Sequence, residues 1–204
     1  MKESGLRRLI SLLGICLLAS SSVWAQQQDG ESIDIYGLGD QTFSISAGMM
    51  LPLFFLGSDG SFDPMNGHVK IGATGSLRWA GFVNNELSIG AELGGMFAPT
   101  VLGRTLISIP IVGFVSHTIR FFPFELALHP GLGVNFLRLD SDLYIGPILK
   151  PGFSIYWNFN SEWAFGLRSE YWFVPEWYFG DSPPASESTF GNFLTVTLST
   201  LYHF

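Results

Sequence analysis

The chain has one cysteine, Cys16, and few charged residues, which make up 13% of its 204 residues. Cys16 lies within the apolar N-terminus that we expect to be removed, so disulfides play no part in the mature protein. Ten Lys and Arg residues stand against 17 Asp and Glu residues, and the basic ones are scattered. Nucleic acid is therefore excluded as a partner, because binding it needs a cluster of basic side chains.

Long apolar runs are also missing beyond the N-terminus, which argues against transmembrane helices because these need about 20 consecutive apolar residues. Residues 1–25, in contrast, read as a secretory signal peptide, with a basic start, an apolar segment over 9–18 and the small residue Ala25 at the end. We expect cleavage after Ala25, which leaves seven basic and 16 acidic residues and a net charge of −9. The alternative of a lipoprotein attached through Cys16 conflicts with the bulky Ile15 before it and with the apolar sequence after it.

Glycine (24 residues) and aromatic residues (15%) are abundant, and apolar side chains recur at every second position. This alternation predicts β-strands. Eight alternating segments are found, each near the length of about 9–11 residues that crosses a bilayer at a tilt. The predicted strands cover roughly residues 42–55, 69–80, 86–97, 105–118, 124–137, 145–158, 162–173 and 193–204, and Pro110 makes the fourth irregular.

Short and longer connections alternate along the chain. The short ones lie near residues 83–86, 121–123 and 158–162, and the longer ones cover 56–68, 98–104, 138–144 and 174–191. Outer-membrane barrels have this arrangement of short periplasmic turns and longer external loops. The sequence therefore predicts an all-β fold, an eight-stranded antiparallel up-and-down transmembrane β-barrel over residues 41–204, preceded by a short periplasmic segment over 26–40.

Each predicted strand has a large apolar face and a face of Gly, Ser, Thr and charged residues. Alternation alone does not separate a membrane barrel from a soluble one, but small residues on the polar face and aromatic residues near strand ends, such as Trp79 and Trp172, favour a lipid-facing apolar side. The polar face then lines a mostly polar lumen, where we expect ion pairs to close the barrel. An alternative is that these pairs exchange and open a narrow pore. The charged residues are Lys70, Arg78, Glu92, Glu125, Lys150, Arg168 and Glu170.

The last strand ends on a phenylalanine, with three apolar or aromatic residues on the same face: Val196, Leu198, Tyr202 and Phe204. Together with Phe43–Gly48, Gly72–Arg78 and Pro130–Asn135, this end resembles small outer-membrane barrels of the OmpW, OmpX and OmpA-transmembrane type. It is also similar to short barrels of spirochaetes such as Treponema. The resemblance implies a bacterial outer-membrane location and recognition of the last strand by the barrel assembly machinery. It implies passive transport of small, often hydrophobic molecules for the OmpW type, and structural or adhesive roles for the others.

No catalytic or metal site is predicted. None of the four histidines stands in the His-x-Ser pair that a lipid-modifying barrel would need, and Ser116 and His117 are adjacent, so they point to opposite faces. His129 faces the lumen, where we expect it to form hydrogen bonds. The acidic segments 58–63 and 140–142 lack the spacing of a calcium loop. We therefore expect no enzyme activity, no cofactor and no bound metal.

The loop 174–191 is the candidate external surface for a host or small-molecule ligand, because exposed aromatic residues favour recognition. Its candidate residues are Glu176, Trp177, Tyr178, Phe179 and Asp181, and the alternative is that these aromatic residues sit at the membrane interface. The preferred interpretation is a monomeric, non-enzymatic barrel in outer-membrane lipid, with a structural or surface-binding role. The alternatives are a narrow OmpW-like channel and a soluble secreted barrel that binds a ligand inside.

Overall fold

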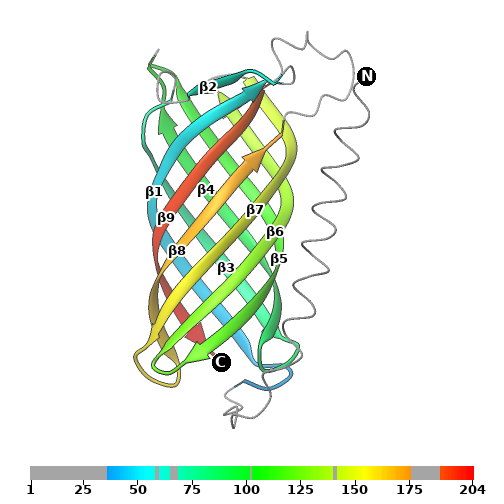
Figure 1. Ribbon diagram of the computed structural model, residues 1–204, viewed down its shortest axis with the longest axis vertical. Helices are drawn as coiled ribbons and strands as arrows, with labels where there is room; N and C mark the ends of the chain where they lie inside the picture. Colours follow the sequence, from blue (N-terminus) through cyan, green and yellow to red (C-terminus); the bar gives the residue numbers. More distant parts are fainter. Residues whose placement is uncertain (1–35, 58–59, 65–68, 102, 140–141, 176–188) are drawn as a thin grey trace. The chain divides into compact units, whose positions relative to one another are not determined.

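The computed structural model describes residues 36–57, 60–64, 69–101, 103–139, 142–175 and 189–204, which form a β-barrel (Figure 1). No helix in this described part is long and apolar enough to cross a membrane. The strands are β1 (Gln41–Gly57), β2 (Phe62–Pro64), β3 (Gly72–Phe82), β4 (Leu87–Pro99), β5 (Thr105–Phe121), β6 (Phe124–Leu139), β7 (Asp142–Asn158), β8 (Trp163–Val174) and β9 (Thr189–His203).

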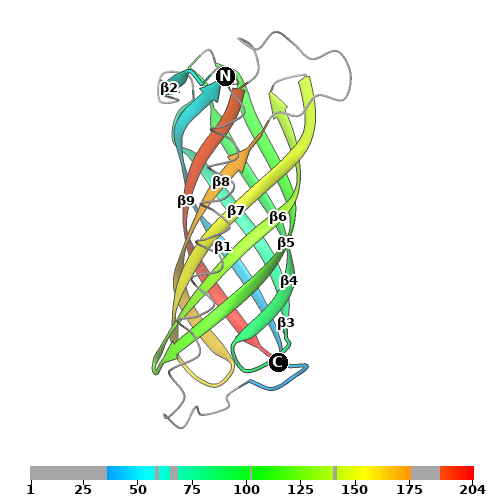
Figure 2. The same ribbon diagram turned by 45° about the vertical axis from the view of Figure 1, so that its right-hand side comes forward.

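Each strand of the barrel wall is antiparallel to its neighbours in the chain, and β1 pairs with β9 to close the sheet. The closing ladder runs from Thr42 opposite His203 to Gly57 opposite Thr189. The three-residue β2 pairs with the end of β1 and is not part of the closed wall, which leaves the eight strands β1 and β3 to β9. The predicted fold class is therefore confirmed, and the strands run obliquely around the barrel in both views (Figure 2).

The irregular fourth strand of the sequence prediction is the continuous strand β5. Its ladder with β4 has no pairs between Leu93–Ile111 and Met96–Ser108, because Pro110 lies in this interval and has no N–H to donate. Gly94 lies opposite, and a Cβ built on it would be only 2.8 Å from the Pro110 ring. A glycine on the neighbouring strand thus makes room for the proline inside the barrel.

The outer face of the barrel is apolar over all its strands. Large side chains point away from the lumen, including Leu132 with 66% and Leu198 with 71% of its surface exposed. Serine, threonine and charged side chains of the same strands point inward and are buried. A soluble monomer rarely exposes a contiguous apolar surface larger than a few hundred Å², so this face contacts lipid and the soluble alternative is excluded.

The two ends of the barrel differ. The chain end, the turn after β3 and the turn after β7 lie at one end, as Figure 1 shows for the C-terminus. Trp79, Trp157 and Trp163 lie on the outer face close to this end, each with 40–48% of its surface exposed. Indole rings favour the boundary between lipid and water, so these residues form part of an interfacial girdle.

Candidate functional site

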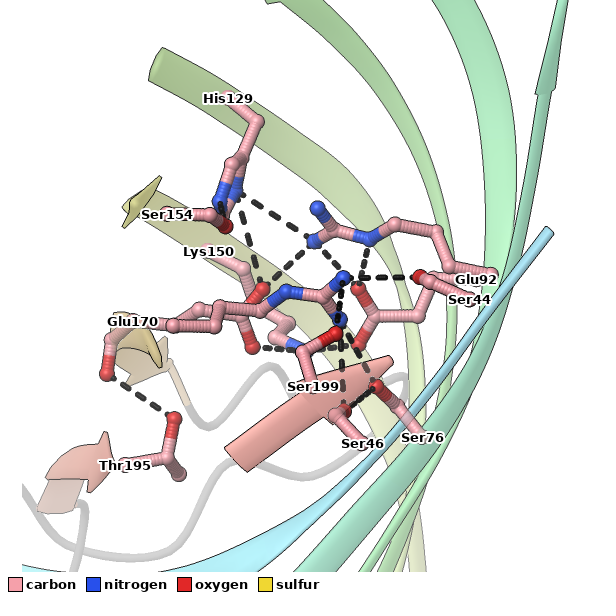
Figure 3. Close-up of polar contacts among 12 residues, drawn as sticks. Ser44, Ser46, Ser76, Glu92, His129, Lys150, Ser154, Glu170, Thr195 and Ser199 are labelled. Atoms are coloured by element: carbon pink, nitrogen blue, oxygen red, sulfur yellow. Dashed lines mark hydrogen bonds and ion pairs between the residues drawn. The ribbon is translucent and has the colours of Figure 1, made fainter. Parts of the chain in front are cut away.

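Four charged side chains meet inside the barrel, one each from β3, β4, β7 and β8 (Figure 3). The Arg78 guanidinium donates to Glu92 over 2.9 and 2.6 Å, and to Glu170 Oε1 over 2.6 Å. Lys150 Nζ lies 3.0 Å from Glu170 Oε2 and also pairs with Glu92. Each cation therefore contacts both carboxylates, and we call this closed set of Arg78, Glu92, Lys150 and Glu170 the ion ring.

The ion ring is shielded from water, since its four side chains expose between 0 and 9% of their surface. Aromatic rings cover its cations: Lys150 Nζ lies 4.3 Å from the Trp172 ring and Arg78 Cζ lies 4.2 Å from the Phe114 ring. Low polarity around the charges strengthens their mutual attraction, and it equally raises the cost of leaving one of them without a partner.

Arg168 is buried beside the ion ring but has different partners. Its Nη2 donates to Ser44 Oγ and to the Tyr156 hydroxyl, each over 2.9 Å. Further contacts of 3.2–3.5 Å lead to serine hydroxyls, and no carboxylate of the described residues lies within 4.0 Å of the guanidinium. The serines that surround it are Ser44, Ser46, Ser76 and Ser199.

His129, Ser154 and Glu170 lie in the order of a catalytic triad, but the geometry does not support catalysis. His129 Nε2 is 2.8 Å from Ser154 Oγ, whereas Nδ1 is 3.7 Å from Glu170, beyond hydrogen-bond distance. Arg78 Nη2, 3.4 Å from Nδ1, is a donor and favours an unprotonated Nδ1. The proton is then on Nε2, so the ring donates to the serine and does not act as its base. This matches the predicted role of His129 as a lumen hydrogen-bonder.

The short-turn end of the lumen is closed by a group that we call the basal cluster: Tyr36, Phe82, Arg120, Glu125 and His203. The Tyr36 ring stacks on Phe82 at 4.4 Å and lies 4.2 Å from Arg120 Cζ. Its hydroxyl donates to Glu125 over 3.2 Å and lies 3.1 Å from His203 Nε2. The pKa of Tyr36 lies well above its ordinary value, mainly because the ring is buried and also because the Glu125 carboxylate lies close to it. The hydroxyl therefore stays protonated.

A cavity of about 50 Å³ separates the basal cluster from the ion ring. Arg78, Arg168 and His129 are on its wall toward the ion ring, and Phe82, Glu125 and His203 belong to both its wall and the basal cluster. Since roughly 10–15 Å³ of such space holds one water molecule, the cavity has room for a small polar ligand. Its hydroxyl-bearing lining residues are Thr42, Ser44, Ser88, Ser116, Thr118, Ser154 and Tyr156.

On the other side of the ion ring most buried lumen side chains are apolar, although a buried hydrogen bond of 2.6 Å joins Ser108 Oγ to Asn135 Oδ1 there. Ile148 precedes Lys150 by two residues on β7, and Trp172 follows Glu170 by two on β8, so both side chains point inward like those two charged residues. Both lie closer to the long connections than the ion ring does. With Phe193 they are at most 2% exposed, and they belong to a cluster that we call the apolar layer. The expectation of a mostly polar lumen is wrong for this half, and Trp172 is a lumen residue and not part of the interfacial girdle.

The predicted charged residues fall into four groups. Four of them form the ion ring, and Arg168 is held apart by hydroxyl groups. Glu125 belongs to the basal cluster, where Arg120 Nε lies 3.6 Å from it. Lys70 is exposed and precedes the first residue of β3, so the alternation of that strand does not apply to it and it is not a lumen residue.

Arg120 and Tyr36 belong to the lumen but were missing from the sequence prediction. Arg120 lies two residues after the inward-facing Thr118, and extending the predicted fourth strand to Phe121 would have found it. Tyr36 comes before β1, where no alternation exists, so no signal in the sequence pointed to it.

Other predicted site residues lie on the outer face or outside the described part. Val196, Leu198 and Phe204 are exposed on the outer face, and Tyr202 packs on Trp163 at 4.8 Å. The candidate loop residues Glu176, Trp177, Tyr178, Phe179 and Asp181, and the predicted signal peptide, lie outside the described residues. Within the described ranges, no group of three or more His, Cys, Asp or Glu side chains is placed to hold a metal ion.

A protein-family model matches residues 25–202, nearly the whole of the chain. The chain belongs to that family. It is similar to an uncharacterized protein of Treponema pallidum, with 26% identity over 184 residues that cover 80% of this chain and 62% of that protein. It is also similar to one of Borreliella burgdorferi, with 25% identity over 185 residues that cover 78% of this chain and 81% of that protein. The chain thus spans less than two thirds of the Treponema relative.

Solved structures with the same fold are outer-membrane and surface proteins. OprG of Pseudomonas aeruginosa matches with a TM-score of 0.51 and 11% identity, over 85% of this chain and 99% of that one. Neisserial surface protein A matches with a TM-score of 0.50 and 12% identity, over 81% and 97%. With the apolar outer face, these likenesses place the chain among the small bacterial outer-membrane β-barrels.

Proposed function

We propose that this barrel is a non-enzymatic membrane protein with a closed lumen, and that its role is structural or lies in binding at its external surface. The observation that carries this proposal is the complete burial of the ion ring and of the apolar layer next to it. Glu92 and Lys150 are each 2% exposed, and Ile148 and Trp172 are 0 and 1% exposed. The lumen of an eight-stranded barrel is narrow enough for side chains to fill it, and they do so at the ion ring and in the apolar layer.

A channel would need a continuous water-filled path, and three successive layers of side chains lie across the described part of the lumen. A permeating ion would have to displace the basal cluster, separate the ion ring and cross the apolar layer. The last step carries a desolvation cost of many kcal/mol for a bare charge. These three barriers support the structural interpretation over the narrow channel.

Planar-bilayer recordings test the proposal. The chain without residues 1–25 is refolded in detergent, and its folding is verified by the faster migration of the unboiled sample on a gel. Protection of the inserted barrel from added protease verifies insertion. We then expect no unitary current steps. Reproducible steps from the folded, inserted wild-type protein would contradict a closed lumen.

We also propose that the outward side chains of the last strand form the signal that the barrel assembly machinery recognises. Leu198 and Phe204 support this, since they are exposed on the strand that closes the barrel against β1. Replacing Phe204 with Ala should reduce the folded fraction in outer membranes but leave refolding into detergent unchanged. An equal loss in both settings would instead indicate a contribution to stability alone.

The external-binding part of the proposal depends on the sequence of the loop 174–191. Its aromatic residues favour a host or small-molecule ligand, and outer-membrane lipid is the other partner that we expect. Deleting residues 177–179 should abolish binding of the folded protein to host cells and leave its heat-modifiable gel migration unchanged. Unchanged cell binding after this deletion would limit the role to a structural one.

A further inference from the structure

The charges inside the described lumen do not balance. Four cationic side chains stand against three carboxylates, which leaves a net charge of +1 with His129 in the neutral form described above. The cations are Arg78, Arg120, Lys150 and Arg168, and the carboxylates are Glu92, Glu125 and Glu170. An uncompensated charge buried inside the barrel is costly, so the excess calls for a counterion.

The unbalanced cation is Arg168. Two cations and two carboxylates neutralise one another in the ion ring, and Arg120 lies beside Glu125 in the basal cluster. Arg168 is 2% exposed, and its described hydrogen-bond partners are all hydroxyl groups, which carry no net charge. Its Nε has no hydrogen-bond partner among the described residues. The surroundings of this guanidinium thus lack one negative charge.

The cavity of about 50 Å³ lies next to this cation and has a lining suited to an anion. Arg78 and Arg168 both contribute to its wall, which makes that side electropositive. Serine and threonine hydroxyls around it can rotate to donate hydrogen bonds. The carboxylate on the opposite wall, Glu125, is already engaged by Arg120 and by the Tyr36 hydroxyl, which weakens its repulsion.

We infer that this cavity binds one small monovalent anion, of which chloride is the probe of choice, as the counterion of Arg168. The volume admits an ion a little larger than water and excludes an organic anion such as gluconate. Binding neutralises the lumen without adding a path through it, so the inference is independent of whether the barrel conducts. It also accounts for the open space kept between two closely packed layers.

The competing source of negative charge is Tyr156. Its hydroxyl lies 2.9 Å from Arg168 Nη2, so a tyrosinate there would balance the guanidinium without any ligand. The two cases differ in observables: an anion site makes stability depend on chloride, whereas a tyrosinate absorbs near 295 nm at neutral pH and needs no chloride.

The first experiment measures thermal unfolding of the refolded protein by its heat-modifiable gel band, at fixed ionic strength, with chloride replaced stepwise by gluconate. We expect the midpoint to rise by about 3–5 °C for each tenfold increase in chloride above its dissociation constant, because this increase adds about 1.4 kcal/mol of stability. The matched variant is Ser44→Asp, which introduces a carboxylate at the position whose serine Oγ lies 2.9 Å from Arg168 Nη2 in the wild type. This variant keeps Arg168, and its midpoint should not depend on chloride.

Two results would overturn the inference. One is a wild-type midpoint that is the same in chloride and gluconate. The other is a chloride effect of equal size in the wild type and in Ser44→Asp, which would place the ion elsewhere. A second measurement, the absorbance near 295 nm at pH 7.5, should show no tyrosinate. A tyrosinate signal that disappears in Tyr156→Phe would assign the counterion to Tyr156 and exclude the anion.

Discussion

Replacing Glu170 with Gln should strongly destabilise the barrel, because it removes one of the two anions that the ring cations share. In the wild type Glu170 accepts a hydrogen bond of 2.6 Å from Arg78 and lies 3.0 Å from Lys150. The amide of Gln has no charge, and its NH₂ group would face a cation. Removing one partner of a buried ion pair costs about 3–5 kcal/mol, and we expect a loss of unfolding free energy in this range.

A second substitution separates the charge imbalance from the loss of packing. Lys150→Met in the Glu170→Gln background removes one cation and leaves Arg78 paired with Glu92. Met has a volume close to that of Lys and packs well against the aromatic ring of Trp172, which covers Lys150 at 4.3 Å. Replacing a whole buried pair is often nearly neutral, so the double variant should be more stable than Glu170→Gln by about 2 kcal/mol.

Urea unfolding in lipid vesicles, followed by tryptophan fluorescence, measures both effects. Glu162→Gln is the matched control, because Glu162 is exposed in a short turn and its replacement should change the unfolding free energy by less than about 0.5 kcal/mol. Two results would show that the ion ring does not hold its charges in this way: a stability of Glu170→Gln equal to that of the control, or losses of Glu170→Gln and of Lys150→Met alone that simply add in the double variant.

Two further predictions concern the outer face and the basal cluster. Leu93→Arg places a charge in the middle of β4, on a residue that is 50% exposed to lipid, and should cost about 2–4 kcal/mol in the same urea assay. Phe122→Arg, in a short turn, should cost about 1 kcal/mol or less, and equal costs would contradict the lipid-facing assignment. Ser116 lines the cavity, so Ser116→Cys provides a probe for entry into it. In that background, Tyr36→Ala should increase the rate at which a small thiol reagent modifies the cysteine at least tenfold. Tyr36→Phe should leave that rate unchanged because it keeps the stacked ring, and a slow reaction in both variants would show that Tyr36 does not close the cavity.

The period-two alternation predicted the eight wall strands, because each of them keeps one parity over most of its length, and the alternating loop lengths and the aromatic strand ends then indicated a membrane barrel. It also placed Arg78 and Glu92 inside, and they lie directly opposite each other on β3 and β4. The partnership of Arg78 with Glu170 is different, since these residues are 92 positions apart on strands that do not pair. Such contacts across the lumen depend on how far the strands are shifted along one another around the closed barrel. The alternation within a single strand carries no information about this shift.

Errors arose where strands begin or end. Lys70 has the parity of a lumen residue but precedes β3, and Arg120 lies beyond the predicted end of its strand. Trp172 was assigned to the membrane interface because it is aromatic and near a strand end, although its parity with Glu170 directs it inward. Parity misleads for Lys70, where the backbone is not yet part of β3, and it gives the correct side for Arg120 and Trp172 once the strands are extended to include them.

The ordering of layers along the lumen explains why a sequence with so few charges buries six of them together. Trp172 belongs to the apolar layer and also covers Lys150 of the ion ring, so the apolar layer shields the ring from water entering through the long connections. The basal cluster and the hydroxyl-lined cavity separate the ring from water at the other end. Shielding from both sides strengthens the pairs within the ring, and it makes the unpaired charge of Arg168 correspondingly costly. The cavity therefore has to lie where it does, on the polar side of the ring and next to Arg168, if a bound anion is to supply the missing charge.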